Sequence, residues 1–397
     1  MDLFTSAHSL VRAHAPTSPA TCLRPHAAAR AARYFRDKFP GDVLYAVKSN
    51  PRIEILDAVH CAGINRFDVA SIVETRLVAE RFPEARLSYM HPVKSREAIR
   101  EAYFGCGVRD FALDSPEELA KIEAATDGAR DLTLLVRLAV PNDHAEFDLS
   151  AKFGIAPARA SALLQRCRAV ADKVGVCLHV GSQCMHPASF ATAIDLVGDV
   201  IRSSGVMLDI VNVGGGYPSH YGDMTPPPLD AYMGEISTAL ARVPIGEGCE
   251  IWTEPGRALV AEAASTLVRV DHRRDDHLFI NDGTYGSLFD AGVPGFVYPV
   301  RAIRRQGGGS DRMMPFAFYG PTCDGMDYMK GPFPLPDDMA EGDYIEIGQT
   351  GAYGATMRTQ FNGFYSDATA ILSDVPMLSQ FTEAVPPPQY DKSGTDQ

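Results

Sequence analysis

The sequence predicts an α/β protein: a (β/α)8 TIM-type barrel followed by a C-terminal domain that is a mostly antiparallel β-barrel or sandwich. Three observations lead to this fold class. The chain has 397 residues, more than one ordinary core requires. Short strand-like runs recur between residues 43 and 256, with helical stretches between them. Beyond Ala264 the strand-like runs continue, but the helical stretches cease.

The barrel prediction depends on eight strand-like runs. They lie at residues 43–49, 66–71, 87–92, 110–115, 133–140, 176–182, 208–216 and 250–256. The stretches between them are rich in Ala, Leu and charged residues, as at 116–126 and 158–174. Strand, helix and strand at this spacing indicate parallel βα units, and eight such units favour a closed barrel.

The second domain is predicted from short runs at 265–273, 277–286, 316–325 and 343–354, separated by turns rich in Gly, Pro and Asp. This pattern of short runs and turns is typical of antiparallel sheets. We expect residues 25–262 to form the barrel, and residues 1–24 and 263–385 to form a β domain that contributes to the active site. The tail at 386–397 is polar and follows a proline-rich stretch, so we expect it to be disordered.

Composition excludes several classes of function. The formal net charge of -13 argues against nucleic acid as a partner. The apolar runs are too short for a membrane-spanning helix, and no export signal is evident at the N-terminus. The 8 cysteines form no CxxC pair and no cluster with His at zinc spacing. We therefore expect no metal site, reduced thiols and a cytoplasmic location.

Every predicted barrel strand ends on a polar side chain or a glycine, where barrels of this kind gather their catalytic residues. A lone aspartate there could instead cap a helix, a lone lysine could reach solvent, and a lone arginine could pair with a nearby carboxylate. Polar ends on all eight strands favour a functional site. The residues are Lys48, Asp68, His91, Asp114, Arg137, His179, Gly214–Gly216, and Glu254 with Gly256 and Arg257.

The glycines narrow the chemistry. "NVGGGYP" follows the seventh run and "EPGR" the eighth, and these are the loops where such barrels bind phosphate. Glycine allows backbone N–H groups to approach an anion closely, whereas a GxGxxG dinucleotide motif is lacking. An anion site, Lys48 and the acid Glu254 together indicate a phosphorylated cofactor with a carbonyl and a basic nitrogen. Pyridoxal phosphate has all three features.

The sequence resembles the fold-type III pyridoxal-phosphate decarboxylases, the ornithine/lysine/diaminopimelate group. The resemblance covers roughly residues 25–365. Its motifs are "YAVKSN", "FDVAS", "LSAKFG", "HVGSQ", "GGGYP", "EPGR", "NDGTYGS", "GPTCDGMD" and "GAYG", and they occur in this order along the chain.

The resemblance implies roles for the matching residues. Lys48 would bind pyridoxal 5'-phosphate covalently, and Asp68 would hydrogen-bond near it. Glu254 would keep the ring nitrogen protonated, His179 would stack on the ring, and Arg137 would position the ring's polar groups. The phosphate would be bound by Ser182, Gly215, Gly216, Gly256, Arg257 and Tyr353.

The resemblance also implies a homodimer whose active sites are shared across the interface. Cys323 and Asp324 would come from the other subunit. Cys323 would protonate the substrate and act with Lys48, His179 and Glu254 as the catalytic group. Asp324, Asp290 and Tyr285 are the candidate substrate-binding residues. Lys94 and Lys152 lie in motif-like contexts and are expected to line the site facing solvent, and Asp327 is a weaker candidate than Asp324.

Decarboxylation of L-ornithine to putrescine, a step of polyamine biosynthesis, is the first hypothesis, because "CDGMD" looks like the ornithine/lysine branch, with Asp324 on the distal ammonium. Segment 288–296 departs from the pattern: Asp290 is out of register with the family's Tyr-Asp pair, and the segment is about one residue shorter. Lysine, diaminopimelate, a carboxylated polyamine and S-adenosylmethionine stay open as substrates. A racemase of the same fold and a non-catalytic homologue that binds pyridoxal phosphate are the further alternatives.

Overall fold

The structure, a computed structural model, describes residues 2–140, 145–147 and 152–381, which fall into two compact units. The barrel unit comprises Ala32–Ser219 and Pro226–Ala258. The sheet unit comprises the described parts of Met1–Ala31, His220–Thr225 and Leu259–Gln397. The tail predicted to be disordered and part of the "LSAKFG" motif lie outside the described residues. The division into units falls at 31/32 and 258/259, where we expected 24/25 and 262/263.

All eight predicted barrel strands are present, and they close into a parallel barrel in the order β11-β12-β3-β4-β5-β6-β7-β9. The barrel prediction is therefore confirmed. The strands are β3 (Asp42–Ala46), β4 (Arg66–Val69), β5 (Arg86–Tyr89), β6 (Asp110–Leu113), β7 (Thr133–Arg137), β9 (Lys173–Cys177), β11 (Ile210–Asn212) and β12 (Glu250–Thr253).

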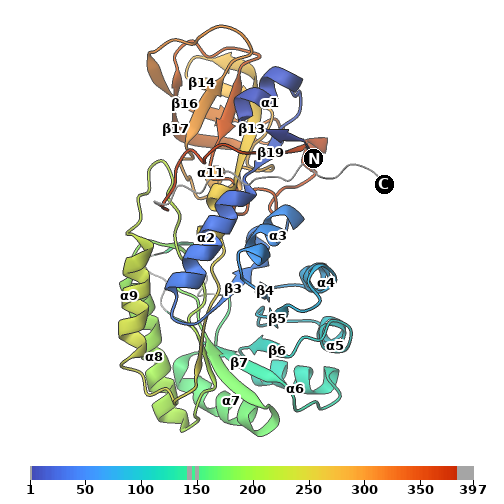
Figure 1. The fold of residues 1–397 in the computed structure, drawn as a ribbon, viewed down its shortest axis with the longest axis vertical. Helices are drawn as coiled ribbons and strands as arrows, with labels where there is room; N and C mark the ends of the chain where they lie inside the picture. The colour runs from blue at the N-terminus through green and yellow to red at the C-terminus, as the bar shows by residue number, and fades with distance from the viewer. Residues whose placement is uncertain (1, 141–144, 148–151, 382–397) are drawn as a thin grey trace. The chain divides into compact units, whose positions relative to one another are not determined.

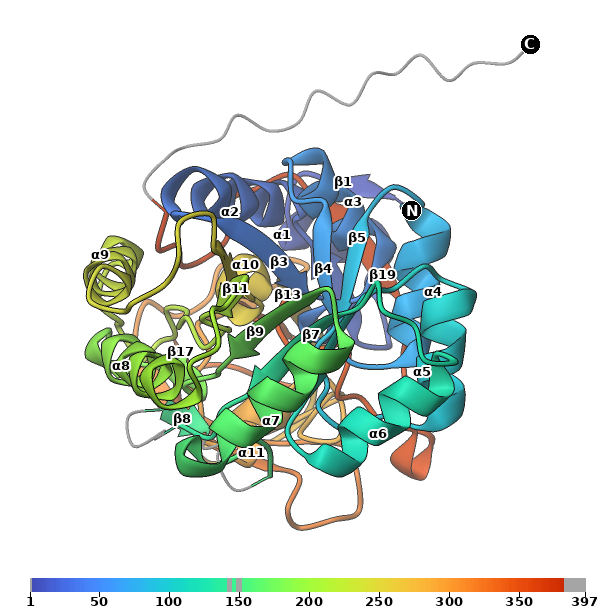
Figure 2. The same cartoon turned by 90° about the horizontal axis from the view of Figure 1, so that it is seen from below.

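Helices surround the barrel strands, as the view in Figure 2 shows. They are α3 (Ile53–Cys61), α4 (Ile72–Arg81), α5 (Arg96–Phe104), α6 (Pro116–Ala125), α7 (Pro157–Val170), α8 (Ala188–Ser204) and α9 (Leu229–Leu240), with α2 (Pro25–Lys38) before the first strand and α10 (Arg257–Val260) after the last. The stretch predicted as helical at 158–174 ends earlier, because Lys173 already begins β9.

Serines precede three of these helices, and their contacts answer whether Asp68 and Asp114 act as helix caps. Ser71, Ser95 and Ser115 precede α4, α5 and α6, and each side chain accepts the backbone N–H three residues on. Asp68 and Asp114 therefore cap no helix. Asp68 lies within β4, and Asp114 accepts the N–H of Gly154 at 2.9 Å.

The barrel strands are shorter than the runs that predicted them. Lys48 lies beyond β3, in the 3₁₀ turn η1 (Val47–Ser49). Asn50 N–H closes this turn on the carbonyl of Val47 at 3.0 Å. Because the strand stops at Ala46, the lysine leaves the buried sheet and stands at the end of the barrel rather than within its wall.

Apolar side chains and one charged network fill the barrel. A core cluster draws one residue from nearly every strand, among them Leu44, Leu135 and Trp252. At the end of the barrel where the strands begin, Arg86 binds Asp110 through two hydrogen bonds of 2.7 and 2.8 Å and lies 4.8 Å from the Trp252 ring centroid. These contacts join the beginnings of β5, β6 and β12.

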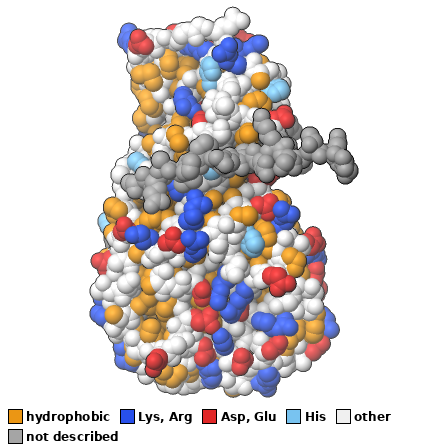
Figure 3. Space-filling model, viewed as in Figure 1, with side chains coloured by type: hydrophobic (Ala, Val, Ile, Leu, Met, Phe, Trp, Pro, Cys, Tyr) orange, Lys and Arg blue, Asp and Glu red, His pale blue; other side chains and the backbone are white. Residues whose placement is uncertain are grey.

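The visible face of the barrel unit carries interspersed acidic and basic side chains (Figure 3). Some pair between neighbouring helices, as Arg81 of α4 does with Asp57 of α3 at 2.8 Å. Exposed pairs of this kind contribute little to stability. Among the described residues, no helix is long and apolar enough to cross a membrane.

The sheet unit is built on a nine-stranded sheet (Figure 1). Its main path runs β1-β19-β2-β13-β14-β16-β17, and β18 joins β13 to β15. Most neighbouring pairs are antiparallel, as predicted. The strands are β1 (Leu3–Phe4), β2 (Ala20–Leu23), β13 (Ala264–Arg274), β14 (His277–Ile280), β15 (Val300–Ile303), β16 (Met313–Tyr319), β17 (Tyr328–Pro336), β18 (Tyr344–Ile347) and β19 (Thr369–Leu372), with helices α1 (Ala7–His14) and α11 (Phe289–Gly292).

Asp327 ties together two loops of the sheet unit. Its buried carboxylate accepts the backbone N–H and the hydroxyl of Thr284 at 2.8 and 2.9 Å. It also accepts the N–H and the hydroxyl of Thr322 at 3.1 and 2.8 Å. A Cβ on Gly283 or on Gly320 would lie 2.1 Å from its Oδ1, so both positions require glycine. Asp327 is thus a structural residue that joins the "NDGTYG" and "GPTCDG" segments.

We expect Asp327→Ala to lower the free energy of unfolding by about 2–4 kcal/mol, because it leaves buried N–H groups without an acceptor. Chemical denaturation followed by tryptophan fluorescence and circular dichroism measures the change. Asp271→Ala is the matched control: its carboxylate is exposed and pairs with Arg269 at 2.8 Å. A loss no larger than that of the control would contradict the structural role.

Candidate active site

Lys48 and Asp68 form an ion pair where strands β3 and β4 end. Lys48 Nζ lies 2.8 Å from Asp68 Oδ2. The lysine side chain is 38% exposed, whereas the aspartate is 1% exposed. The second carboxylate oxygen, Oδ1, is buried and has no hydrogen-bond partner among the described residues. A buried acceptor in this state is costly, so this oxygen points to a donor from a bound group.

Glu254 is a buried carboxyl just after β12. Its Oε1 accepts the side-chain N–H of Asn212 at 2.6 Å, and Asn212 Oδ1 accepts the N–H of Gly214 at 2.8 Å. Burial, together with the negative charge of Asp68, raises the pKa of Glu254 to about 7 against the opposing effects of Lys48 and Arg137. The carboxyl therefore changes its protonation near neutral pH, and a cationic partner would hold it ionised.

His179 follows β9 and is held in one tautomer. Its Nδ1 accepts the N–H of Gly181 at 3.1 Å, so a neutral ring carries its proton on Nε2. Desolvation and the positive charges of Arg137 and Lys48 lower its pKa well below the ordinary value. The ring is therefore neutral at physiological pH. A neutral imidazole offers a flat surface on which an aromatic group can stack.

Arg137 is the last residue of β7 and acts electrostatically on its neighbours. Its charge lowers the pKa values of His179 and Glu254. It also opposes the burial that raises the pKa of Cys177 to about 12. A cation among these groups offsets part of the cost of burying the carboxylates.

The glycine loops bring backbone close to backbone. Gly214 has a φ of +70°, and a Cβ there would lie 1.9 Å from the carbonyl oxygen of Leu178. Gly216 has a φ of +114°, and its Cβ would lie 2.4 Å from the carbonyl oxygen of Gly181. Only glycine fits either position. These approaches draw together the loops that follow β9 and β11.

The remaining predicted phosphate residues of the barrel unit lie on the same loops. Ser182 begins the short strand β10 (Ser182–Cys184), and its Oγ accepts from Arg257 Nε at 3.3 Å. A Cβ on Gly215 would lie 2.4 Å from the Glu254 carbonyl oxygen. A Cβ on Gly256 would lie 3.2 Å from Ser49 Cβ. Hydrogen bonds and close backbone approaches thus link the loops after β3, β9, β11 and β12.

One expectation about lysines is wrong. We expected Lys94 to face solvent, but its side chain is fully buried and forms an ion pair with Glu118 Oε1 at 3.1 Å. Its Nζ also donates to the carbonyls of His91 and Ala112 at 2.9 and 2.6 Å, and burial lowers its pKa to about 8. Lys94 thus anchors the loop after β5 instead of reaching solvent. Lys152 is exposed, as expected.

The sheet unit holds the predicted substrate residues. Tyr285 donates its hydroxyl to Asp324 Oδ2, and the N–H of Met326 donates to Asp324 Oδ1 at 3.0 Å. These bonds hold the pKa of Asp324 below its ordinary value, so the carboxylate is ionised. Cys323 is exposed beside it. Asp290 is buried in α11, at 4% exposure.

Tyr353 also belongs to the sheet unit, in the "GAYG" turn after β18. It is partly buried and has a φ of +62°, which is unusual for a residue with a side chain. Such strained positions gather at functional sites.

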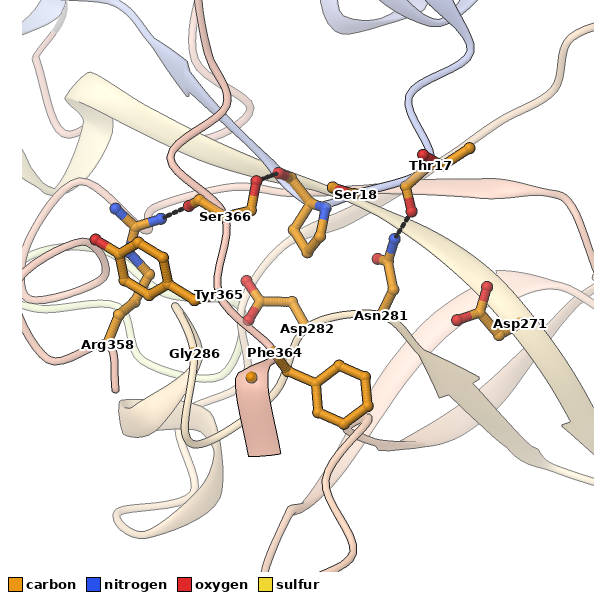
Figure 4. Close-up of a pocket in the computed structure, with 12 residues that line it drawn as sticks. Thr17, Ser18, Asp271, Asn281, Asp282, Gly286, Arg358, Phe364, Tyr365 and Ser366 are labelled. Atoms are coloured by element: carbon orange, nitrogen blue, oxygen red, sulfur yellow. Dashed lines mark hydrogen bonds between the residues drawn. The ribbon is translucent and has the colours of Figure 1, made fainter. Parts of the chain in front are cut away.

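A separate cavity of about 230 Å³ lies in the sheet unit (Figure 4). Asn281 Nδ2 donates to the carbonyl of Thr17 at 3.0 Å, and Ser366 Oγ donates to that of Pro19 at 2.7 Å. Arg358 donates to the carbonyl of Ser366. These polar groups bind one another across the cavity, and none of the predicted site residues lines it.

Asn212 and Gln183 are two site residues that the sequence interpretation missed. Asn212 holds Glu254, and a polar residue inside the apolar run "IVNV" was the available signal. Gln183 lies within the "HVGSQ" motif, yet its contacts depend on a distant loop. Among the described residues, no group of three or more His, Cys, Asp and Glu side chains could hold a metal ion.

A parallel barrel that gathers a paired lysine, a neutral imidazole, a buried carboxyl and glycine loops at one end has the groups that a phosphorylated carbonyl cofactor requires. The pyridoxal binding domain of the pyridoxal-dependent decarboxylases matches residues 26–261. The lysine/ornithine decarboxylase of Selenomonas ruminantium is 31% identical over 343 residues, covering 84% of each chain. The diaminopimelate decarboxylase of Actinosynnema pretiosum subsp. auranticum is 30% identical over 354 residues, covering 83% of this chain and 78% of that protein.

A solved structure is similar to this chain along nearly its whole length. The lysine/ornithine decarboxylase of Vibrio vulnificus, complexed with cadaverine, superposes with a TM-score of 0.79 at 29% identity, over 94% of this chain and 100% of that chain. The chain belongs to the pyridoxal-dependent decarboxylase family, in the basic amino-acid group. It is a carboxy-lyase, and pyridoxal phosphate is its cofactor. The predicted family, enzyme class and cofactor are confirmed.

The barrel residues fit this cofactor. The unpartnered Oδ1 of Asp68 can accept a donor, the titrating Glu254 suits a basic ring nitrogen, and the glycines bring together the loops after β9, β11 and β12, in the region where barrels of this kind bind phosphate. The roles of individual residues stay predictions.

We expect Glu254 to make the cofactor-free protein less stable as pH rises. Its folded pKa of about 7 lies above the ordinary value of 4.5, so the folded state binds more protons between these values. Its stabilising contribution is therefore complete below pH 4.5 and is lost as pH rises through 7. Glu254→Gln removes this titration, so the fall in melting temperature from pH 5 to about pH 8 becomes smaller. Equal falls in both proteins would contradict the assignment.

Proposed function

We propose that the enzyme decarboxylates L-ornithine to putrescine. The observation that carries the proposal is the ionised carboxylate of Asp324, which Tyr285 and the N–H of Met326 hold in place. A carboxylate fixed in this way suits the distal ammonium of a diamino acid. The lysine/ornithine decarboxylases among the relatives act on substrates with such an ammonium.

In this proposal, Lys48 binds the cofactor covalently and Asp68 orients the lysine through their 2.8 Å contact. The cofactor, when bound, supplies an electron sink for the pair of electrons left as carbon dioxide departs. Glu254 holds a proton on the ring nitrogen, because its carboxylate stabilises a cationic partner. The neutral His179 provides the stacking surface, and Arg137 orients the polar groups of the ring.

The phosphate is held by backbone and side-chain donors. We assign it to Ser182, Gly215, Gly216, Gly256, Arg257 and Tyr353. Support comes from the hydrogen bond between Arg257 and Ser182 and from the glycines that let the loops after β9, β11 and β12 approach one another closely. Anions bind favourably where several N–H groups converge.

The proton that replaces the carboxyl group is delivered by Cys323 to Cα of the substrate. Its exposure at the surface of one chain supports a role toward a second copy, in a homodimer with shared active sites. Lysine is the second candidate substrate, because segment 288–296 departs from the ornithine pattern and buries Asp290 in α11. Diaminopimelate, a carboxylated polyamine and S-adenosylmethionine complete the panel to be tested.

The substrate is tested by incubating the enzyme with each amino acid and measuring carbon dioxide and the amine product. We expect the highest kcat/KM with L-ornithine. Asp324→Asn should lower it by about 10- to 100-fold, since a charged partner of the ammonium is lost. Asp290→Asn is the comparison, and a larger loss in that variant would move the ammonium site to α11. Faster turnover of another amino acid would overturn the choice of ornithine.

Shared sites are tested by mixing inactive variants. Lys48→Ala and Cys323→Ala should each be inactive, and mixed subunits should regain up to about a quarter of the wild-type activity, because half of the dimers are mixed and each holds one intact site. Lys48→Ala mixed with Glu254→Gln is the control. Both changes lie in the barrel of one subunit, so this mixture stays inactive. No recovery in the first mixture, despite demonstrated subunit exchange, would contradict shared sites.

A further inference from the structure

A closed set of hydrogen bonds joins three loops where the barrel strands end. Gln183 Nε2 donates to the carbonyl of Ser219 at 2.6 Å, and the N–H of Ser219 returns to Gln183 Oε1 at 2.9 Å. Ser219 Oγ then donates to the carbonyl of Arg257 at 3.2 Å. Arg257 Nε donates to Ser182 Oγ at 3.3 Å, next to Gln183. The loops after β9, β11 and β12 are thereby linked.

Gln183 occupies a position that a residue with a side chain rarely adopts. Its φ is +55°, in the left-handed region, and the residue is completely buried. Strain of this kind persists only where the surroundings over-determine it. Both ends of its amide are used in the two bonds to Ser219, so the side chain fixes the strained backbone. The next N–H, of Cys184, donates to the carbonyl of Gly216 at 2.9 Å and holds the glycine loop as well.

We propose that Gln183 is a positioning residue for the cofactor phosphate, which holds Ser182, Gly216 and Arg257 in one arrangement by clamping Ser219. This inference rests on the proposed function for the assignment of those three residues to the phosphate. Gln183 itself binds no phosphate. Its effect is transmitted through the loops, so it acts on the phosphate end of the cofactor and leaves the lysine end, at Lys48 and Asp68, unaffected.

The test compares cofactor affinities of the full-length protein. After removal of the cofactor, wild type and Gln183→Gly are titrated with pyridoxal phosphate and with pyridoxal, which lacks the phosphate, and the absorbance of the bound form is followed. Glycine removes both amide bonds but suits the left-handed backbone. We expect the affinity for pyridoxal phosphate to fall roughly tenfold or more, as two lost hydrogen bonds imply, with pyridoxal changed less than about twofold.

Ser88→Ala is the matched control. It removes a buried hydrogen bond, from Ser88 Oγ to Asp110 Oδ2 at 2.8 Å, that joins β5 to β6 and is none of the bonds between the three loops, so it should keep the wild-type preference. Ser219→Ala removes only the hydroxyl bond to Arg257 and should lower the preference for pyridoxal phosphate by a smaller factor. If Gln183→Gly does not fold, Ser219→Ala serves as the test instead. An unchanged preference of Ser219→Ala for pyridoxal phosphate over pyridoxal would then overturn the inference.

The outcomes separate the two proposals. If wild type prefers pyridoxal phosphate and Gln183→Gly keeps that preference, or loses affinity for both ligands equally, Gln183 has only a structural role and the inference is overturned. If wild type itself shows no preference over pyridoxal, the phosphate assignment of the proposed function fails, and the inference fails with it.

Discussion

The barrel site depends on how two carboxyl groups are accommodated in a buried place. Burial raises the pKa of Glu254, and the charge of Asp68 acts in the same direction. Lys48, paired with Asp68 at 2.8 Å, and Arg137 supply the opposing charge. These cations favour the ionised form of the buried Glu254 carboxyl. Burial, and after it the charges of the same cations, lowers the pKa of His179 and keeps its ring neutral.

The backbone of the barrel unit supports this cluster with short-range constraints. Strand β3 stops at Ala46, so η1 carries Lys48 out of the sheet. Beyond the strands, loops approach one another at glycines where a Cβ has no room, and the amide of Gln183 joins them. These contacts stabilise the loops locally, which a site that must hold a ligand in one geometry requires.

The sheet unit uses a comparable device at Asp327. One buried carboxylate accepts four hydrogen bonds from two threonines and so brings the loop of Tyr285 to the loop of Cys323 and Asp324. Tyr285 then meets Asp324 directly. A structural aspartate therefore determines where a candidate functional aspartate stands, although both belong to the same short motif.

The sequence alone determined the fold class, because strand and helix periodicities repeat eight times and then change. It also determined the family and cofactor, through motifs whose residue types match the chemistry of a phosphorylated aldehyde. The residues that cap the helices were harder to predict from the sequence. Helix capping by Asp68 and Asp114 was an open alternative, but the nearby Ser71 and Ser115 take that position, since a serine immediately before the helix reaches the third N–H.

Tertiary structure decided what depends on contacts between distant segments. Lys94 is buried because the end of β6 and α6 supply its partners, Ala112 and Glu118, and no pattern near Lys94 indicates this. The pKa of Glu254 depends on Asp68, far away in the chain, and Gln183 gains its role only from Ser219. Residue types and spacing specify which groups are available, whereas burial and long-range pairing set their protonation and position.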